Sequence, residues 1–157
     1  MPAMSLTQQG SSATLAPADL AAWRGFLRAH AVLVPQLDDE LRAEHGISVS
    51  GYEVLRFLAD APGHRMRPGE LAAAALLTPS GITRLCDRLE RDGLIKRESC
   101  DDDGRGSLVV LTEAGQERVR EAQRTHLAGV RRRFLDLLTE QEIEVLGNVW
   151  KRVAGEP

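Results

Sequence analysis

The polar and basic residues that follow Thr78-Pro79 have the types and spacing of a surface that binds phosphates and base edges. Arg84 and Arg88 are four residues apart, so on a helix they share one face. Each guanidinium there can donate two hydrogen bonds to a guanine edge or to a phosphate. The residues before them are small, which lets the start of a helix approach a groove closely and donate backbone N–H groups to phosphate. The predicted contacts are Ser80, Gly81, Thr83, Arg84 and Arg88. For any single arginine, a solvated helix face is an equally good interpretation.

A second group is the acidic turn at 100–106, which contains three aspartates and Arg105. Aspartates beside glycine suggest a calcium loop, but the EF-hand spacing with a glutamate at the twelfth position is absent. At the tip of a hairpin, Arg105 could enter a minor groove, where negative potential attracts arginine. We expect Asp103 to support this tip by pairing with an arginine.

Other chemistry is not supported by the sequence. It contains no Gly-rich phosphate loop, nucleophile elbow or His-Glu-x-x-His pattern, so we predict neither an enzyme nor a cofactor. Cys86 and Cys100 have neither disulfide-framework nor zinc-site spacing, and we predict two reduced thiols without a metal. Cys86 lies beside an apolar stripe and is expected to pack in the core.

The elements that must position these residues are three short helices and a hairpin. A capping box at Ser50–Glu53 predicts a helix over 50–60, and Pro68 predicts the start of a second helix to about Leu76. Thr78 can cap a third helix over 79–92, which Gly93 ends. This third helix has an apolar stripe of Ile82, Leu85 and Leu89. Two short β runs, 94–98 and 107–111, then predict a hairpin, and the order is that of a winged helix-turn-helix.

Longer helices flank this region. An apolar seam of Leu20, Leu27, Val34 and Leu41 runs along a helix at 18–44, which contains Pro35 and ends near Gly46. Thr112 is expected to cap a helix to about Leu137, and Thr139–Glu142 to open a last helix at 140–153. The inward residues predicted for the helix that Thr112 caps are Val119, Leu127, Val130 and Phe134. One small winged domain leaves part of these seams uncovered, which predicts a symmetric dimer.

Composition agrees with one mostly α domain with a small β-wing. The chain has 157 residues, is 43% hydrophobic and carries a net charge of −3, yet residues 64–97 hold seven basic against four acidic side chains. No apolar run reaches the ~18 residues of a membrane span, and we expect a cytoplasmic protein.

The predicted parts are a flexible tail at 1–16, a dimerisation region at 17–46 and 113–157, and a DNA-binding lobe at 47–112.

The run LAAAALLTPSGITRLCDRLERDGLIKRE at 71–98, followed by DDDGRGSLVVLTEAG, resembles the multiple-antibiotic-resistance-regulator (MarR) family. Asp103 to Arg105, with Leu111-Thr112, match its wing signature, and the resemblance covers about residues 18–154. It implies an obligate homodimer on a palindromic double-stranded operator, often released by a small phenolic or other carboxylate ligand. It also implies DNA contacts by the five residues named above and by Arg105. Cys100 departs from the aspartate of many members, and the absence of cysteine at 18–44 disfavours peroxide sensing.

The resemblance also implies a site for such a ligand. Aromatic or polar-tipped residues on the helices that the family packs around its pocket are Trp23, His30, Tyr52, Arg56 and His126. They suit a small aromatic or aliphatic carboxylate, although a lone histidine on such a helix is more often a core or dimer-interface group than a ligand contact. The arginines at 131–133 are expected to be solvated or to touch the DNA backbone. A regulator without a ligand and a winged-helix protein–protein adaptor remain alternatives.

Overall fold

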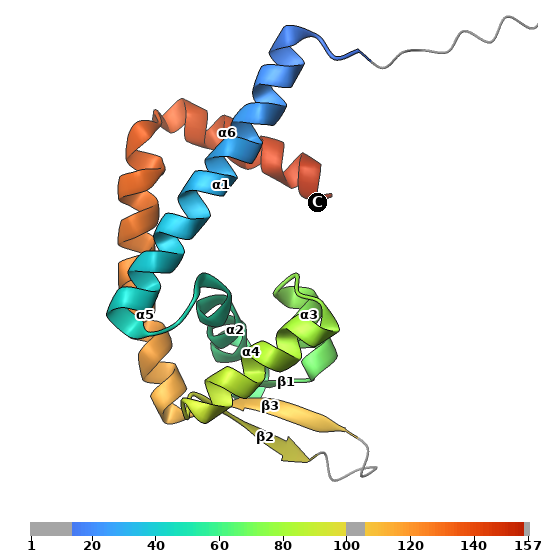
Figure 1. Cartoon of the computed structure of the whole chain (residues 1–157), viewed down its shortest axis with the longest axis vertical. Helices are drawn as coiled ribbons and strands as arrows, with labels where there is room; N and C mark the ends of the chain where they lie inside the picture. The colour runs from blue at the N-terminus through green and yellow to red at the C-terminus, as the bar shows by residue number, and fades with distance from the viewer. Residues whose placement is uncertain (1–13, 100–105, 156–157) are drawn as a thin grey trace, which may run out of the picture. The chain divides into compact units, whose positions relative to one another are not determined.

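The computed structural model describes residues 14–99 and 106–155 and has the predicted order of elements (Figure 1). The central elements are the helices α2 (Val49–Asp60), α3 (Pro68–Ala74) and α4 (Pro79–Arg91) and the strands β1 (Arg65–Met66), β2 (Ile95–Ser99) and β3 (Ser107–Leu111). The flanking helices are α1 (Pro17–His45), α5 (Glu113–Arg133) and α6 (Glu140–Ala154). The predicted class, mostly α with a small β-wing, is therefore confirmed. The contacts of the chain divide it into two units, residues 1–32 and 33–157.

The sheet contains one strand more than expected. β2 and β3 form the predicted antiparallel hairpin, with Ile95 opposite Leu111 and Ser99 opposite Ser107. β1 pairs with the other edge of β3, Arg65 opposite Val110, which gives the order β1-β3-β2. A two-residue strand between helices carries no periodicity of its own, so only the pairing partner defines it.

Most helix starts follow the local capping signals. Thr78 Oγ1 accepts a hydrogen bond from Gly81 N at 3.1 Å, and Thr112 Oγ1 accepts one from Gly115 N at 3.0 Å. Thr139 and Glu142 form the predicted capping box. The start predicted for α2 was wrong: Ser48, not Ser50, caps this helix, and its Oγ accepts from Gly51 N at 3.0 Å. The carboxylate of Asp38 on α1 accepts from Val49 N at 2.8 Å, so two acceptors from outside the predicted box fix the earlier start.

The ends of the helices depend on backbone conformation. Gly46 and Gly93, predicted as stops, have φ of 69° and 72°, in the left-handed region that favours glycine. α1 is a single helix through Pro35. α5 ends at Arg133, earlier than predicted, because Phe134 leaves the helical region with φ −131° and ψ −61°. A short 3-10 helix at Leu135–Leu137 then leads to α6.

The core lies between the three short helices, the sheet and α5. Its buried side chains include Val54, Leu55, Leu58, Leu71, Ile82, Leu85, Leu89, Ile95, Val109 and Val119. Cys86 belongs to this core, and burial raises the pKa of its thiol. A buried thiol with a raised pKa has little thiolate character, which suits a packing role. The inward orientation predicted for Leu127 was wrong, since its side chain is 55% exposed.

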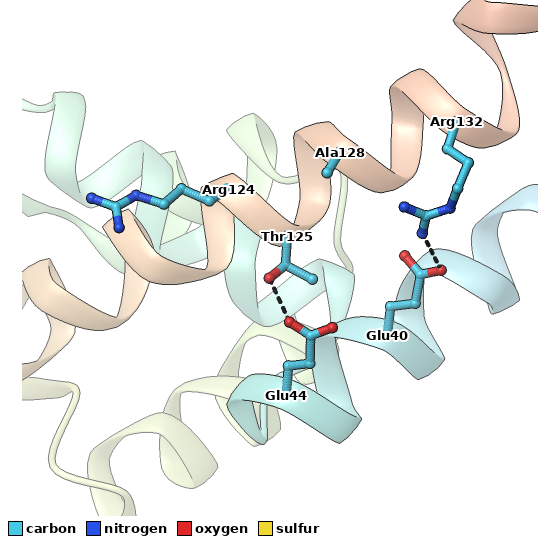
Figure 2. A pocket seen from close by; sticks show the side chains of 6 residues that line it. All are labelled: Glu40, Glu44, Arg124, Thr125, Ala128 and Arg132. Atoms are coloured by element: carbon cyan, nitrogen blue, oxygen red, sulfur yellow. Dashed lines mark hydrogen bonds and ion pairs between the residues drawn. The ribbon is translucent and has the colours of Figure 1, made fainter.

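The C-terminal part of α1 is tied to α5 by polar contacts (Figure 2). Arg132 and Arg133 both donate to Glu40, and their hydrogen bonds lower the pKa of that carboxyl. Thr125 donates to Glu44 at 2.8 Å. Both residues line an open hollow of about 290 Å³. Two of the three arginines predicted to be solvated therefore join the two helices. Along the described ranges, no helix is long and apolar enough to cross a membrane.

Candidate nucleic-acid interface

α4 has the two unlike faces that the sequence predicts. Ile82, Leu85 and Leu89 are buried against the core, which fixes the orientation of the helix. The opposite face is exposed and consists of Ser80, Thr83, Arg84, Asp87, Arg88 and Arg91. The structure therefore brings the predicted Ser80, Thr83, Arg84 and Arg88 together on one exposed surface. Gly81 lies at the start of the same helix and is half-buried.

The first turn of α4 is compact and kept in place by short side chains. Thr83 Oγ1 donates to the Pro79 carbonyl at 2.8 Å, and the hydroxyls of Thr78 and Ser80 are 3.3 Å apart. A Cβ on Gly81 would lie 3.0 Å from the capping oxygen of Thr78, tighter than an ordinary contact. Glycine at this position therefore protects the cap as well as keeping the helix start narrow.

Cations on this face are available to a partner. Among the residues that the structure describes, Arg84 and Arg88 have neither an ion pair nor a side-chain hydrogen bond, and both are exposed. Arg91 differs, because its Nε donates to the Asp87 carbonyl at 3.3 Å. Two unpaired guanidinium groups one helical turn apart can bind an anionic partner without first breaking a contact of their own.

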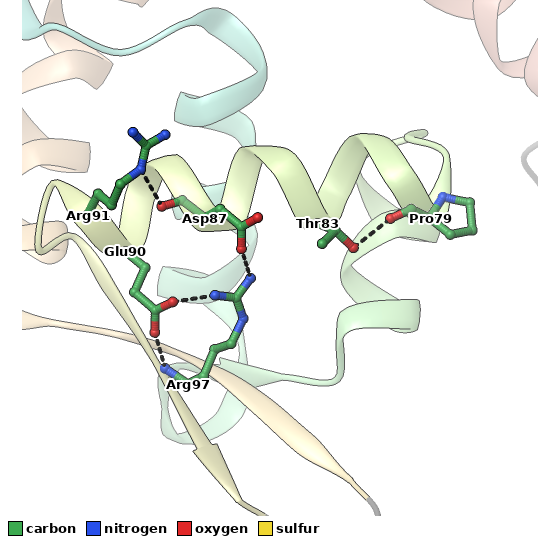
Figure 3. Close-up of polar contacts among 6 residues, drawn as sticks. All are labelled: Pro79, Thr83, Asp87, Glu90, Arg91 and Arg97. Carbon is green, nitrogen blue, oxygen red and sulfur yellow. Dashed lines mark hydrogen bonds and ion pairs between the residues drawn. The ribbon is translucent and has the colours of Figure 1, made fainter.

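The acidic residues of α4 are engaged by β2 (Figure 3). Arg97 Nη2 donates to Asp87 Oδ1 at 2.6 Å, and Arg97 Nη1 donates to Glu90 Oε2. The backbone N of Arg97 also donates to Glu90 Oε1 at 3.1 Å. The hydrogen bond with Asp87, followed by the charge of Glu90, raises the pKa of Arg97. The sequence does not predict this cluster, because its only local signal is the pair of acids three residues apart on α4.

The wing is described up to its base. β2 ends at Ser99 and β3 begins at Ser107, and the predicted tip residues Asp103 and Arg105 lie outside the described residues. At the base, Lys96 Nζ binds Glu98 Oε1 at 2.7 Å, and Arg65 Nη1 lies 3.6 Å from Glu98 Oε2. Burial of Ile95, Val109 and Leu111 attaches both strands to the core, so the hairpin leaves the lobe from a fixed base.

The predicted ligand residues fall into two groups. Tyr52 and His126 meet, with ring centroids 4.8 Å apart, while Trp23 and His30 are exposed on the unit formed by residues 1–32. Arg56, near Tyr52 on α2, binds Glu53 at 2.8 Å and Asp60 at 3.3 Å and lies over the Phe57 ring.

The pair of rings from Tyr52 and His126 is largely removed from water. Burial raises the pKa of Tyr52, and burial lowers the pKa of His126 and so favours its neutral ring. Nδ1 of His126 is buried with no hydrogen-bond partner among the described residues. Such an atom is costly unless a partner reaches it.

Comparison with known proteins identifies the family. The sequence model of the MarR family matches residues 45–106. The HTH-type transcriptional repressor YetL of Bacillus subtilis is 30% identical over 115 residues, which cover 71% of this chain and 69% of YetL. The Escherichia coli regulator PrsX is 31% identical over 117 residues, 73% of this chain and 68% of PrsX.

Two solved structures from Streptomyces coelicolor are similar over nearly the whole chain. AbsC, a MarR family transcriptional regulator, has a TM-score of 0.84 at 35% identity and covers 90% of this chain and 95% of its own. Sco3205, another member, was solved in complex with DNA; it has a TM-score of 0.85 at 33% identity, over 90% of this chain and 92% of its own. These relatives are regulators rather than enzymes, and the chain belongs to the MarR family of transcriptional regulators.

Proposed function

We propose that this protein is a cytoplasmic repressor that binds a palindromic DNA operator as a homodimer and is released by a small carboxylate ligand. The observation that carries the DNA-binding part is the exposed face of α4, which begins with a compact turn and bears Arg84 and Arg88, both without an ion pair among the described residues. Two relatives support it: Sco3205 was solved in complex with DNA, and YetL is named a repressor.

On this proposal α4 is the recognition helix. Its N-terminal turn enters the major groove, where Ser80, Gly81 and Thr83 approach the DNA, and Arg84 and Arg88 bind guanine edges or phosphates. Arg105 at the wing tip enters the minor groove, and Asp103 supports the tip. Bases are read by the helix, and the wing adds affinity through the phosphate backbone and groove potential.

Replacement of Arg84 and of Arg105 by alanine should change DNA affinity in different ways. Arg84→Ala is expected to cost ~1–3 kcal/mol on the operator and less on scrambled DNA, because it removes a bidentate base contact. Arg105→Ala should weaken binding to both sequences alike and flatten the salt dependence. Titrations of fluorescent operator and scrambled duplexes at two salt concentrations measure both effects. Unchanged affinity in both variants would refute the assignment and favour a protein–protein adaptor.

The homodimer is proposed to form through residues 17–46 and 113–157, around the DNA-binding lobe at 47–112. Support comes from apolar side chains that the described chain leaves exposed on α6, including Ile143, Val145 and Val153, and from Leu127 on α5. Exposed apolar side chains gathered on a helix are typical of a face that a partner covers. A second copy covers it symmetrically and sets two α4 helices about one DNA turn, ~34 Å, apart.

The ligand part of the proposal rests on the pair of rings formed by Tyr52 and His126. The partnerless Nδ1 of His126 can donate to a carboxylate or accept from a phenol. Arg56 is expected to add positive charge, although its guanidinium is already shared with Glu53 and Asp60. The predicted Trp23 and His30, on the unit formed by residues 1–32, remain proposed ligand contacts. A ligand regulates only by the difference in its affinity for the free and DNA-bound dimer, typically ~1–3 kcal/mol.

A panel of small aromatic and aliphatic carboxylates tests this part. We expect an active compound to change tryptophan fluorescence and to displace operator DNA, and His126→Phe to abolish both effects while DNA binding persists. His30→Phe, on the exposed face of α1, is the matching variant for the second group of proposed residues, Trp23 and His30. If no compound displaces DNA, a regulator without a ligand is the better interpretation. If active compounds affect His126→Phe and the native protein equally, the ligand binds elsewhere.

A further inference from the structure

We propose that Arg97 is a positioning residue for DNA binding: it clamps the base of the wing to α4 and neutralises the two carboxylates that α4 would otherwise bring toward DNA. The inference rests on the proposed DNA-binding function and adds to it a residue outside the recognition face. Arg97 lies on β2, seven residues after Glu90 and ten after Asp87 along the chain.

The geometry joins two elements that must act together on DNA. The Arg97 guanidinium donates to Asp87 Oδ1 at 2.6 Å and to Glu90, and its backbone N–H donates to the second oxygen of Glu90 at 3.1 Å (Figure 3). Both acids belong to the last two turns of α4, and Arg97 belongs to the strand that leads into the wing. One side chain thus fixes the direction of the wing relative to the recognition helix, which lysine, with a single point charge, would do less well.

The charges explain why such a clamp is needed. Asp87 is exposed and follows Thr83 by four residues and Arg84 by three, so it lies on the face proposed to meet DNA. An unpaired carboxylate there would repel the phosphate backbone and offset a neighbouring arginine. With Arg97 bound across Asp87 and Glu90, the acids lose much of their field, and Arg84 and Arg88 dominate the surface.

A charge-balanced series of variants tests the proposal by fluorescence titration of operator DNA. Arg97→Gln leaves two unpaired acids and should weaken binding by about tenfold, a loss that shrinks at high salt. The triple variant Asp87→Asn, Glu90→Gln, Arg97→Gln removes the acids together with their partner and should recover most of that loss. Lys96→Gln is the matched control: it removes one cation from the same strand, and Lys96 binds Glu98 rather than α4.

The outcomes separate the clamp from other roles of Arg97. Recovery in the triple variant, with Lys96→Gln close to native, supports neutralisation of Asp87 and Glu90 as the larger part of the role of Arg97. Native-like binding by Arg97→Gln overturns the proposal, and equally weak binding by the single and triple variants overturns the neutralisation, because unpaired acids would then not cause the loss. A large drop in melting temperature that matches the loss of binding would assign Arg97 a purely structural role. Failure of the native protein to bind any operator would instead refute the proposed function.

Discussion

Gly115→Ala should lower the free energy of unfolding by about 3 kcal/mol, at the upper end of the cost of overpacking a core. A Cβ at this position would lie 2.1 Å from the Leu94 carbonyl oxygen and 2.6 Å from Leu111 Cδ1. The first of these is backbone, and the same oxygen accepts a hydrogen bond from Thr112 N at 3.1 Å. Relief of the clash therefore requires movement of α5 away from β2, which breaks the junction between helix and sheet.

Urea denaturation at one fixed protein concentration measures this effect, because stability is linked to concentration if the chain dimerises. Gly69→Ala is the matched control: it makes the same chemical change in α3, where a Cβ would meet nothing within 4 Å. It should leave stability unchanged or raise it by up to about 1 kcal/mol. Equal midpoints for the two variants would contradict the close packing of α5 on the Leu94 carbonyl.

The second large effect is expected at the proposed dimer interface. The double variant Ile143→Glu, Val153→Glu places two carboxylates on the apolar face of α6, where the native side chains are 39% and 74% exposed. Each native side chain covered by a partner contributes up to ~1.5–3 kcal/mol, and a buried unpaired charge is strongly unfavourable. The variant should be a monomer at micromolar concentration and should bind operator about 100-fold more weakly, because two linked half-sites become independent.

Sedimentation velocity and operator titration on the same samples check the two effects together. Asn148→Glu adds a carboxylate to an exposed polar position of the same helix and should leave both the dimer and its affinity unchanged. A double variant that remains dimeric would place the interface elsewhere. A monomer that retains the full operator affinity would show that DNA binding does not need two copies.

Features that depend on neighbouring residues were predictable from the sequence. Thr78, Thr112 and Thr139 each cap the helix that the sequence predicts, because a cap needs only a side-chain oxygen and an N–H three residues on. The stripe of Ile82, Leu85 and Leu89 likewise fixed the two faces of α4, and with them the exposed residues proposed to meet DNA.

Features that depend on distant partners were not predictable. Asp38 caps α2 from α1, and so the helix begins earlier than its own capping box suggests. β1 exists only through its pairing with β3. Arg97 lies on a strand and binds acids seven and ten residues away on a helix, so neither helical nor strand spacing predicts the contact. In each case a tertiary contact decides the outcome, and one sequence alone carries no signal for it.

We propose that this chain reads one DNA sequence as a dimer, and nuclease footprinting of the native protein on the DNA upstream of its own gene tests this proposal. We expect protection of an inverted repeat whose half-site centres are about one helical turn, ~34 Å, apart. Arg84→Ala should lose this protection at concentrations where the native protein is saturating. Absence of any protected repeat, or equal binding of native protein to operator and scrambled DNA, would refute sequence-specific binding by a dimer.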